Sequence, residues 1–263
     1  MEEGVKKYYY ENGQISVEYN DKTHKLTSWN EKGALRSYSF IIQTGNPRTK
    51  EQLLEESWDK NGLKCLERNF DENGYVHGYE KFWDNGRLSQ FTLYEHGKPV
   101  KYTSWTYGHK NEYREEYVYD TKENSYKRGY YSKEYKNDVL INEGNYLYGR
   151  DEHGEHVQYY DNGKLKCKKQ YNNGKLDGKY IRWYDNGNIE SIKYFSSNSL
   201  HGTTTYWDKN GVKTYETIYN HNKNVKSTFW RDDGSIEYIT YDKEGKLLTD
   251  KCYDKNGKLI QNY

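Results

Sequence analysis

The residues that could do chemistry in this sequence are eight histidines, three cysteines and numerous carboxylates. His153 and His156 flank Gly154 and could form a metal-binding pair, but no cysteine or carboxylate cluster stands in phase with them. Adjacent carboxylates such as Glu115 and Glu116 point to opposite faces of a strand, which disfavours paired acid–base chemistry. The sequence therefore predicts no catalytic residue, no metal and no cofactor.

The remaining chemical signatures are also missing. The sequence has no nucleophile elbow, no phosphate-binding loop and no zinc-protease motif. Cys65, Cys167 and Cys252 are an odd number at wide spacing, which fits reduced thiols and not a disulfide framework. His77 and His201 each precede a glycine at the same phase of an internal repeat, so we expect them to be structural. We predict that the protein is not an enzyme.

The composition indicates an ordered chain with an aromatic core. There are 32 Tyr and 7 Trp, 31% of the residues are charged, and the net charge is only +1. Because helix formers such as Ala are scarce and Gly is abundant, a helical bundle is excluded. A pI near 7.6 gives no electrostatic case for nucleic acid.

No apolar run is long enough to cross a membrane as a helix, and the first residues are polar and charged. We therefore expect no membrane span and a cytoplasmic location for the chain as it is given.

Turn glycines recur with a regular period. Gly163, Gly187, Gly211, Gly234 and Gly257 are spaced 24, 24, 23 and 23 residues apart. Second turns are expected halfway between them, at Asn173-Gly174, Asn198-Ser199, Asn222-Lys223 and Glu244-Gly245. One repeat is therefore two strands and two turns, which is a hairpin signal.

One slot of this repeat is always aromatic and holds all seven tryptophans. We call it the aromatic column, and its members are Tyr9, Trp29, Trp58, Trp83, Trp105, Tyr159, Trp183, Trp207, Trp230 and Tyr253. One interpretation is a structural ladder of side chains that stack along one face. The other is an exposed platform for a sugar chain, a peptide or bases.

Consecutive hairpins predict an all-β fold, namely an elongated, twisted antiparallel meander in a single domain over 1–263. The repeats are regular over 53–108 and 154–263 and irregular over 34–57 and 109–150, where either degenerate repeats or an insertion would fit. Residues 49–56 fit a lengthened strand or a single helical turn. Nothing blunts the two edge strands, so we expect a monomer or weak end-to-end association.

The tyrosine-rich stretch 109–150 is the predicted partner site, because protein interfaces favour tyrosine and irregular repeats commonly carry binding. The predicted contact residues are Tyr113, Tyr117, Tyr119, Tyr126, Tyr130, Tyr131, Glu115 and Glu116.

The unit Gly-x4-[Trp/Tyr]-[Tyr/Asp]-Asp-x-Asn-Gly-x-[Leu/Ile] resembles the variant MORN repeat of bacterial proteins, and in particular the YwqK-like antitoxin family. The resemblance is strongest over 154–263 and 53–108 and weaker over 1–45. It implies stacked hairpins and a protein that binds and neutralises a cognate toxin. The Tyr-x-Gly-x-Trp element of the classical MORN pattern is replaced here, so a phosphoinositide role is not carried over.

The sequence thus predicts a non-enzymatic, protein-binding repeat protein, an antitoxin or immunity protein by resemblance. The alternative is a carbohydrate-binding or structural surface repeat protein that uses an exposed aromatic ladder.

Overall fold

The structure is a computed structural model that describes residues 4–44, 52–71, 73–119, 129–147, 149–243 and 246–262. Every element of these residues is a β-strand, and no helix suited to crossing a membrane is found among them. The chain divides into two compact units, unit 1 over Met1–Thr121 and unit 2 over Lys122–Tyr263.

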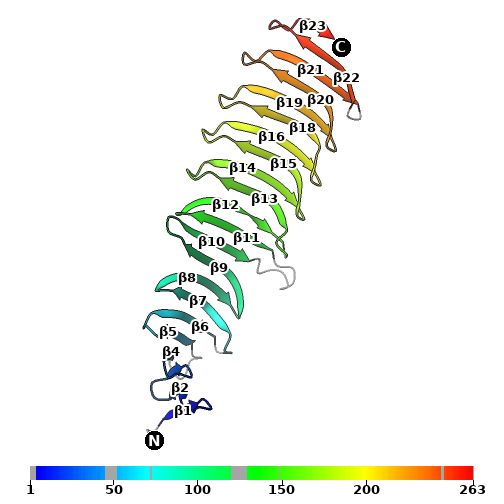
Figure 1. Cartoon of the computed structure of the whole chain (residues 1–263). Helices are drawn as coiled ribbons and strands as arrows, with labels where there is room; N and C mark the ends of the chain where they lie inside the picture. The colour runs from blue at the N-terminus through cyan, green and yellow to red at the C-terminus, as the bar shows by residue number, and fades with distance from the viewer. Residues whose placement is uncertain are drawn as a thin grey trace. The chain divides into compact units, whose positions relative to one another are not determined.

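Unit 1 is an antiparallel meander in which each strand pairs with the next one in the chain (Figure 1). Its strands are β1 (Val5–Tyr9), β2 (Ile15–Asn20), β3 (Lys25–Trp29), β4 (Leu35–Thr44), β5 (Gln52–Asp59), β6 (Lys64–Phe70), β7 (Val76–Asp84), β8 (Arg87–Glu95), β9 (Lys98–Tyr107) and β10 (Glu112–Tyr119).

Unit 2 follows the same plan (Figure 1). Its strands are β11 (Tyr130–Lys136), β12 (Val139–Tyr146), β13 (Glu152–Tyr159), β14 (Leu165–Asn172), β15 (Lys175–Trp183), β16 (Ile189–Ser196), β17 (Ser199–Leu200), β18 (Gly202–Trp207), β19 (Lys213–Asn220), β20 (Lys223–Trp230), β21 (Ile236–Lys243), β22 (Lys246–Tyr253) and β23 (Leu259–Asn262). The short β17 and β18 both pair with β16, so they form one interrupted strand.

Three-residue loops that end in glycine follow every member of the aromatic column except Trp83 and Trp105. In the loop after Tyr184, the Gly187 N–H donates to Tyr184 O and the Tyr184 N–H donates to Asn188 O. Gly187 has a φ of 100°, which a residue with a Cβ adopts only with strain. Neighbouring repeats are joined here, because the Tyr184 hydroxyl donates to Trp207 O at 2.9 Å and the Tyr160 hydroxyl to Trp183 O at 2.7 Å.

Two-residue turns with positive φ at both positions close several further hairpins, at Asn85-Gly86, His96-Gly97, Asn137-Asp138, Asn173-Gly174, Ser197-Asn198 and His221-Asn222. The predicted turn at Asn173-Gly174 is present, but two others lie one residue earlier than predicted, at Ser197-Asn198 and His221-Asn222. The reason is that asparagine takes the second left-handed position, where its N–H and Oδ1 bind the preceding hairpin: Asn198 contacts Leu176 in this way. The predicted turn at Glu244-Gly245 lies outside the described residues.

Strand register shifts by one residue beside the aromatic column. Trp183 pairs with Ile189 whereas Arg182 pairs with Ser191, so Glu190 is the extra residue of a bulge. The same shift occurs beside every member of the column except Trp105. Because such bulges increase local twist, the column marks a repeated bend in the hairpins of its other members.

The interior is thin. The buried apolar residues among those described are Val157, Cys167 and Ile239, and most other buried side chains are Thr or Ser. Stability must therefore come from cross-strand contacts on both faces.

The prediction of an all-β meander of repeated hairpins is confirmed. Of the two readings of 49–56, the strand is correct for the described part, since β5 covers Gln52–Asp59. The single-domain assignment stays a prediction; the boundary between the two compact units falls inside the irregular stretch 109–150.

Candidate functional site

The face that carries the aromatic column, which we call the Trp face, also carries ion pairs. In unit 1, Lys64 Nζ lies 2.5 Å from Glu56 Oε1, forms an ion pair with Glu67, and lies 5.3 Å from the ring centre of Trp83. Lys81 Nζ contacts Glu67 at 3.2 Å. Desolvation would raise the pKa of Glu67, but hydrogen bonds from Lys64, Tyr79 and Lys81 outweigh it and lower the pKa to about 2.

On the Trp face of unit 2, two tyrosines share one carboxylate. The hydroxyls of Tyr131 and Tyr159 both donate to Glu143, the latter at 2.5 Å, and Lys133 lies 3.9 Å away. Burial and the bond to Glu143 raise the pKa of Tyr159 to about 12 and raise that of Tyr131 as well. Despite desolvation, the two phenols and Lys133 lower the pKa of Glu143.

These shifts move the pKa of each group further from pH 7. General acid–base catalysis works best with a pKa near the operating pH, whereas here the carboxylate is held ionised and the phenols are held protonated. The Tyr131–Glu143–Tyr159 cluster is therefore suited to fixing side chains in place, not to proton transfer.

The opposite face, which we call the Tyr face, carries a row of contacting rings in unit 2, in which Phe229 and Tyr238 are stacked and the other pairs are tilted. Ring centres are 5.7 Å apart between Tyr206 and Tyr215, 4.6 Å between Tyr215 and Phe229, and 4.0 Å between Phe229 and Tyr238. Each pair is directly opposite in the strand register. This continuous row supplies the cross-strand packing that aliphatic residues supply in other sheets.

The predicted partner residues in unit 1 lie on β10 and alternate between its faces. Tyr113, Glu115, Tyr117 and Tyr119 share the Tyr face, and Glu116 lies on the other. Tyr113 is 42% exposed, and the Tyr117 hydroxyl donates to Glu115 at 2.8 Å. On the opposite face Glu116 pairs with Lys101 at 3.6 Å and Arg114 at 3.3 Å.

The remaining predicted partner residues belong to unit 2. Tyr130 stacks on Tyr146 with ring centres 5.1 Å apart, and Tyr131 binds Glu143 on the other face. Tyr126 lies outside the described residues. Since Tyr130 and Tyr131 point to opposite faces, they cannot contact one flat partner surface together.

The aromatic column is half-buried at every position except Tyr9, which is exposed. Some of the half-buried rings are covered by a neighbour, as Trp58 is by Tyr38 at 5.1 Å and Trp230 is by Lys213 at 4.2 Å. A packed ladder and a surface with accessible ring edges are both compatible with this exposure.

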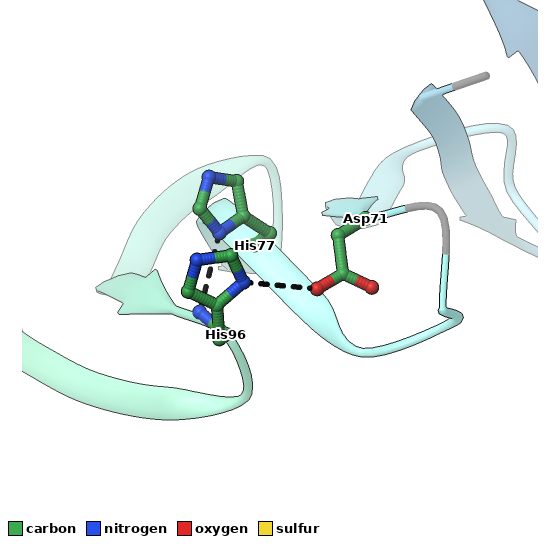
Figure 2. Close-up of side chains that lie close together, drawn as sticks. All are labelled: Asp71, His77 and His96. Carbon is green, nitrogen blue, oxygen red and sulfur yellow. Dashed lines mark hydrogen bonds and ion pairs between the residues drawn. The ribbon is translucent and has the colours of Figure 1, made fainter. Parts of the chain in front are cut away.

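One group of potential ligands was missed by the sequence analysis. Asp71, His77 and His96 each offer a ligand atom, and these atoms lie within 4.8 Å of one another (Figure 2). Their spacings in the sequence match no compact metal motif. The signal that could have found them is the hairpin period, because His96 follows His77 by 19 residues and His221 follows His201 by 20.

Comparison with known proteins identifies the repeat. The family model described as "MORN repeat variant" matches residues 2–20, 152–173 and 176–196. No curated protein matches the chain. A porin-like protein from Bacteroides uniformis is among the similar solved structures, with 12% identity, coverage of 98% of this chain and 92% of that chain, and a TM-score of 0.14.

The matched segments correspond to hairpins in the structure, namely β1–β2, β13–β14 and β15–β16. MORN repeats are generally protein- or membrane-binding modules without enzymatic activity. The chain therefore contains variant MORN repeats in both of its units.

Proposed function

We propose that this chain is a non-enzymatic, protein-binding repeat protein that neutralises a cognate bacterial toxin, as an antitoxin or immunity protein. The observation that carries the proposal is the surface of β10. There Tyr113 is 42% exposed and shares the Tyr face with Tyr117 and Glu115, which are joined by a hydrogen bond. An exposed aromatic ring beside polar side chains is typical of the residues that dominate protein interfaces.

Blocking a toxin requires no chemistry from the blocker. A hairpin whose turns and strands satisfy their own hydrogen bonds presents its side chains in fixed positions, so little conformational entropy is lost on binding. The resemblance to the YwqK-like antitoxin family supports the same proposal.

The test is co-expression of the neighbouring open reading frame with and without this chain, followed by size-exclusion chromatography. We expect growth to be rescued and the two proteins to elute together. Toxicity that this chain does not relieve, or the absence of a complex, would contradict the proposal. In that case a glycan array would examine the alternative of a carbohydrate-binding aromatic ladder.

A matched pair of variants locates the surface. Tyr113→Ala should weaken the complex at least tenfold, as loss of an aromatic hot spot does. Tyr194→Ala, on β16 of unit 2, removes a tyrosine of nearly equal exposure, 41%, and should leave the affinity unchanged. Equal losses in both variants would argue against β10 as the contact strand.

A further inference from the structure

Three side chains from two neighbouring hairpins of unit 1 lie close together at one end of the strands, where the chain turns. Asp71 opens the three-residue loop between β6 and β7, His77 is the second residue of β7, and His96 begins the two-residue turn between β8 and β9. The β7–β8 pairing brings the turn at His96 beside the start of β7, where the Gly97 N–H donates to Val76 O at 2.9 Å.

The ligand atoms are close to a metal-binding arrangement. Asp71 Oδ2 lies 3.3 Å from His96 Nδ1, and the two imidazole ring centres are 4.9 Å apart (Figure 2). Metal–ligand distances of about 2.0–2.2 Å place neighbouring ligands of a tetrahedral Zn²⁺ ion about 3.4 Å apart. The Asp71–His96 separation already has this value.

We propose that Asp71, His77 and His96 bind a divalent transition-metal ion of the Zn²⁺ class. Two imidazoles and one carboxylate form a ligand set that such ions favour. Three protein ligands leave a fourth position open to water or to a group from another molecule. His77 Nδ1 now accepts a hydrogen bond from the backbone N–H of His96 at 3.2 Å. The ion would therefore replace this contact or bind the other ring nitrogen of His77.

The carboxylate is already oriented for this role. Its Oδ1 accepts the N–H groups of Asn73 and Tyr75 at 2.9 and 3.0 Å, which leaves Oδ2 directed at His96. The His96 side chain is 77% exposed, so it can rotate toward an ion with little loss of packing. Binding would link the β6–β7 loop to the β8–β9 turn.

Other repeats of the same chain contain parts of this arrangement but not the whole. His201 and His221 occupy the corresponding positions in unit 2 with ring centres 4.6 Å apart, yet β16 ends there in a two-residue turn that supplies no carboxylate. Asp59 and Asp208 cap three-residue loops as Asp71 does, without forming such a group. Among the described residues, three potential ligands converge at Asp71, His77 and His96.

The test is titration of the full chain, with any affinity tag removed, first with Co²⁺ followed by visible absorption and then with Zn²⁺ by calorimetry. We expect one equivalent to bind, with the absorption of a tetrahedral Co²⁺ site. Binding no tighter than that of the variants below would overturn the proposal.

The variants are chosen so that the hairpins keep their turns. Asp71→Asn retains the cap, because Asn30 caps the same kind of loop elsewhere in the chain. His96→Asn retains the left-handed turn position, which Asn173 occupies with a φ of 49°. Each should weaken binding at least tenfold, whereas the matched control His221→Asn should not. Equal weakening by His221→Asn would show that paired histidines alone bind the ion and would refute a three-ligand site.

Discussion

The hairpins β5–β8 of unit 1 and β18–β21 of unit 2 share one backbone plan but are linked by different side-chain contacts. In unit 1 the strands are joined by ion pairs, such as Arg68 with Glu55 at 2.7 Å and Lys81 with Glu67 at 3.2 Å. In unit 2 the positions of Arg68 and Glu80 hold Thr217 and Ser227, whose hydroxyls are hydrogen-bonded to each other. Rings contact one another along the same face, and of the ion pairs Lys213 with Glu216 at 2.5 Å is kept.

The difference shows that a thin sheet does not need an aliphatic interior. What the fold requires is that each strand contacts both neighbours through its side chains, and either chemistry does this. The two solutions should respond differently to perturbation. Ring stacking and buried hydroxyls are insensitive to moderate pH changes, whereas ion pairs depend on the ionisation of their carboxylates.

The largest expected effect is loss of a ring from the row in unit 2. Phe229 contacts Tyr215 on one side and Tyr238 on the other, so Phe229→Ala should lower the free energy of unfolding by about 3 kcal/mol. Denaturation by urea, followed by tryptophan fluorescence, measures it. Tyr194→Ala, which truncates an exposed ring, should cost less than about 0.5 kcal/mol. If the two substitutions had equal costs, the contacts of Phe229 with Tyr215 and Tyr238 would add no more stability than an exposed ring does.

The next effect in size is the difference between substituting a buried hydroxyl that is hydrogen-bonded and substituting one that is not. Thr217 and Thr204 are direct cross-strand partners and both are buried. The Thr217 hydroxyl donates to Asn224 Oδ1 at 3.0 Å and accepts from Ser227, whereas Thr204 Oγ1 has no hydrogen-bond partner among the described residues.

Thr217→Val should therefore cost about 2 kcal/mol, because Asn224 Oδ1 loses its donor and the Ser227 hydroxyl loses its acceptor, although Asn224 Nδ2 and Tyr215 still contact Ser227. Thr204→Val should be neutral or stabilising, since it removes a polar atom that is buried without compensation. The unfolding curves of the two variants measure both costs. A cost for Thr204→Val similar to that for Thr217→Val would show that the two hydroxyls do not differ in their contribution to stability.

The fold could be predicted because its signals are local. Asn-Gly dipeptides need left-handed backbone, and strands of about eight residues between them leave little choice but hairpins. The bulge beside Trp183 could not be predicted, since the extra residue Glu190 follows from how two strands twist together and leaves no mark in residue type. The turn at Ser197-Asn198 was misplaced because serine also fits a turn flank.

The predicted sites depend on non-local geometry and were harder to anticipate. Strand alternation separates Glu115 from Glu116 and Tyr130 from Tyr131, as can be deduced from sequence parity alone. The meeting of Asp71 with His96 could not be deduced in that way. It requires the register of two strand pairings and the larger loop after Phe70, which brings a carboxylate to a turn 25 residues away.

A smaller effect concerns the ion pairs of unit 1 in acid. Because the pKa of Glu67 is lowered to about 2, its contribution to stability is present above the ordinary glutamate pKa of 4.5 and is lost as the pH falls from there toward 2. After discounting for solvent screening, this contribution is about 1 kcal/mol.

The variant Glu67→Gln should therefore be less stable than the wild type at pH 7 and nearly equal to it at pH 2.5, as measured by urea denaturation at both values. Glu155→Gln removes an exposed ion pair of unit 2 and should change stability by less than about 0.5 kcal/mol at pH 7. A difference between wild type and Glu67→Gln that does not vary with pH would show that the carboxylate acts through packing alone.

The smallest expected effect lies at alkaline pH, in unit 2. The pKa of Tyr159 is raised to about 12, so the neutral phenol stabilises the folded state fully below pH 10, and this stability is lost as the pH rises from 10 to 12. With solvent screening the contribution is about 0.5 kcal/mol. In Tyr159→Phe this alkaline loss should be smaller, although Tyr131 still donates to Glu143. Unfolding at pH 8 and pH 11 measures it. An unchanged alkaline slope in Tyr159→Phe would mean that the bond to Glu143 adds no stability, and ring packing would then be the main link in unit 2.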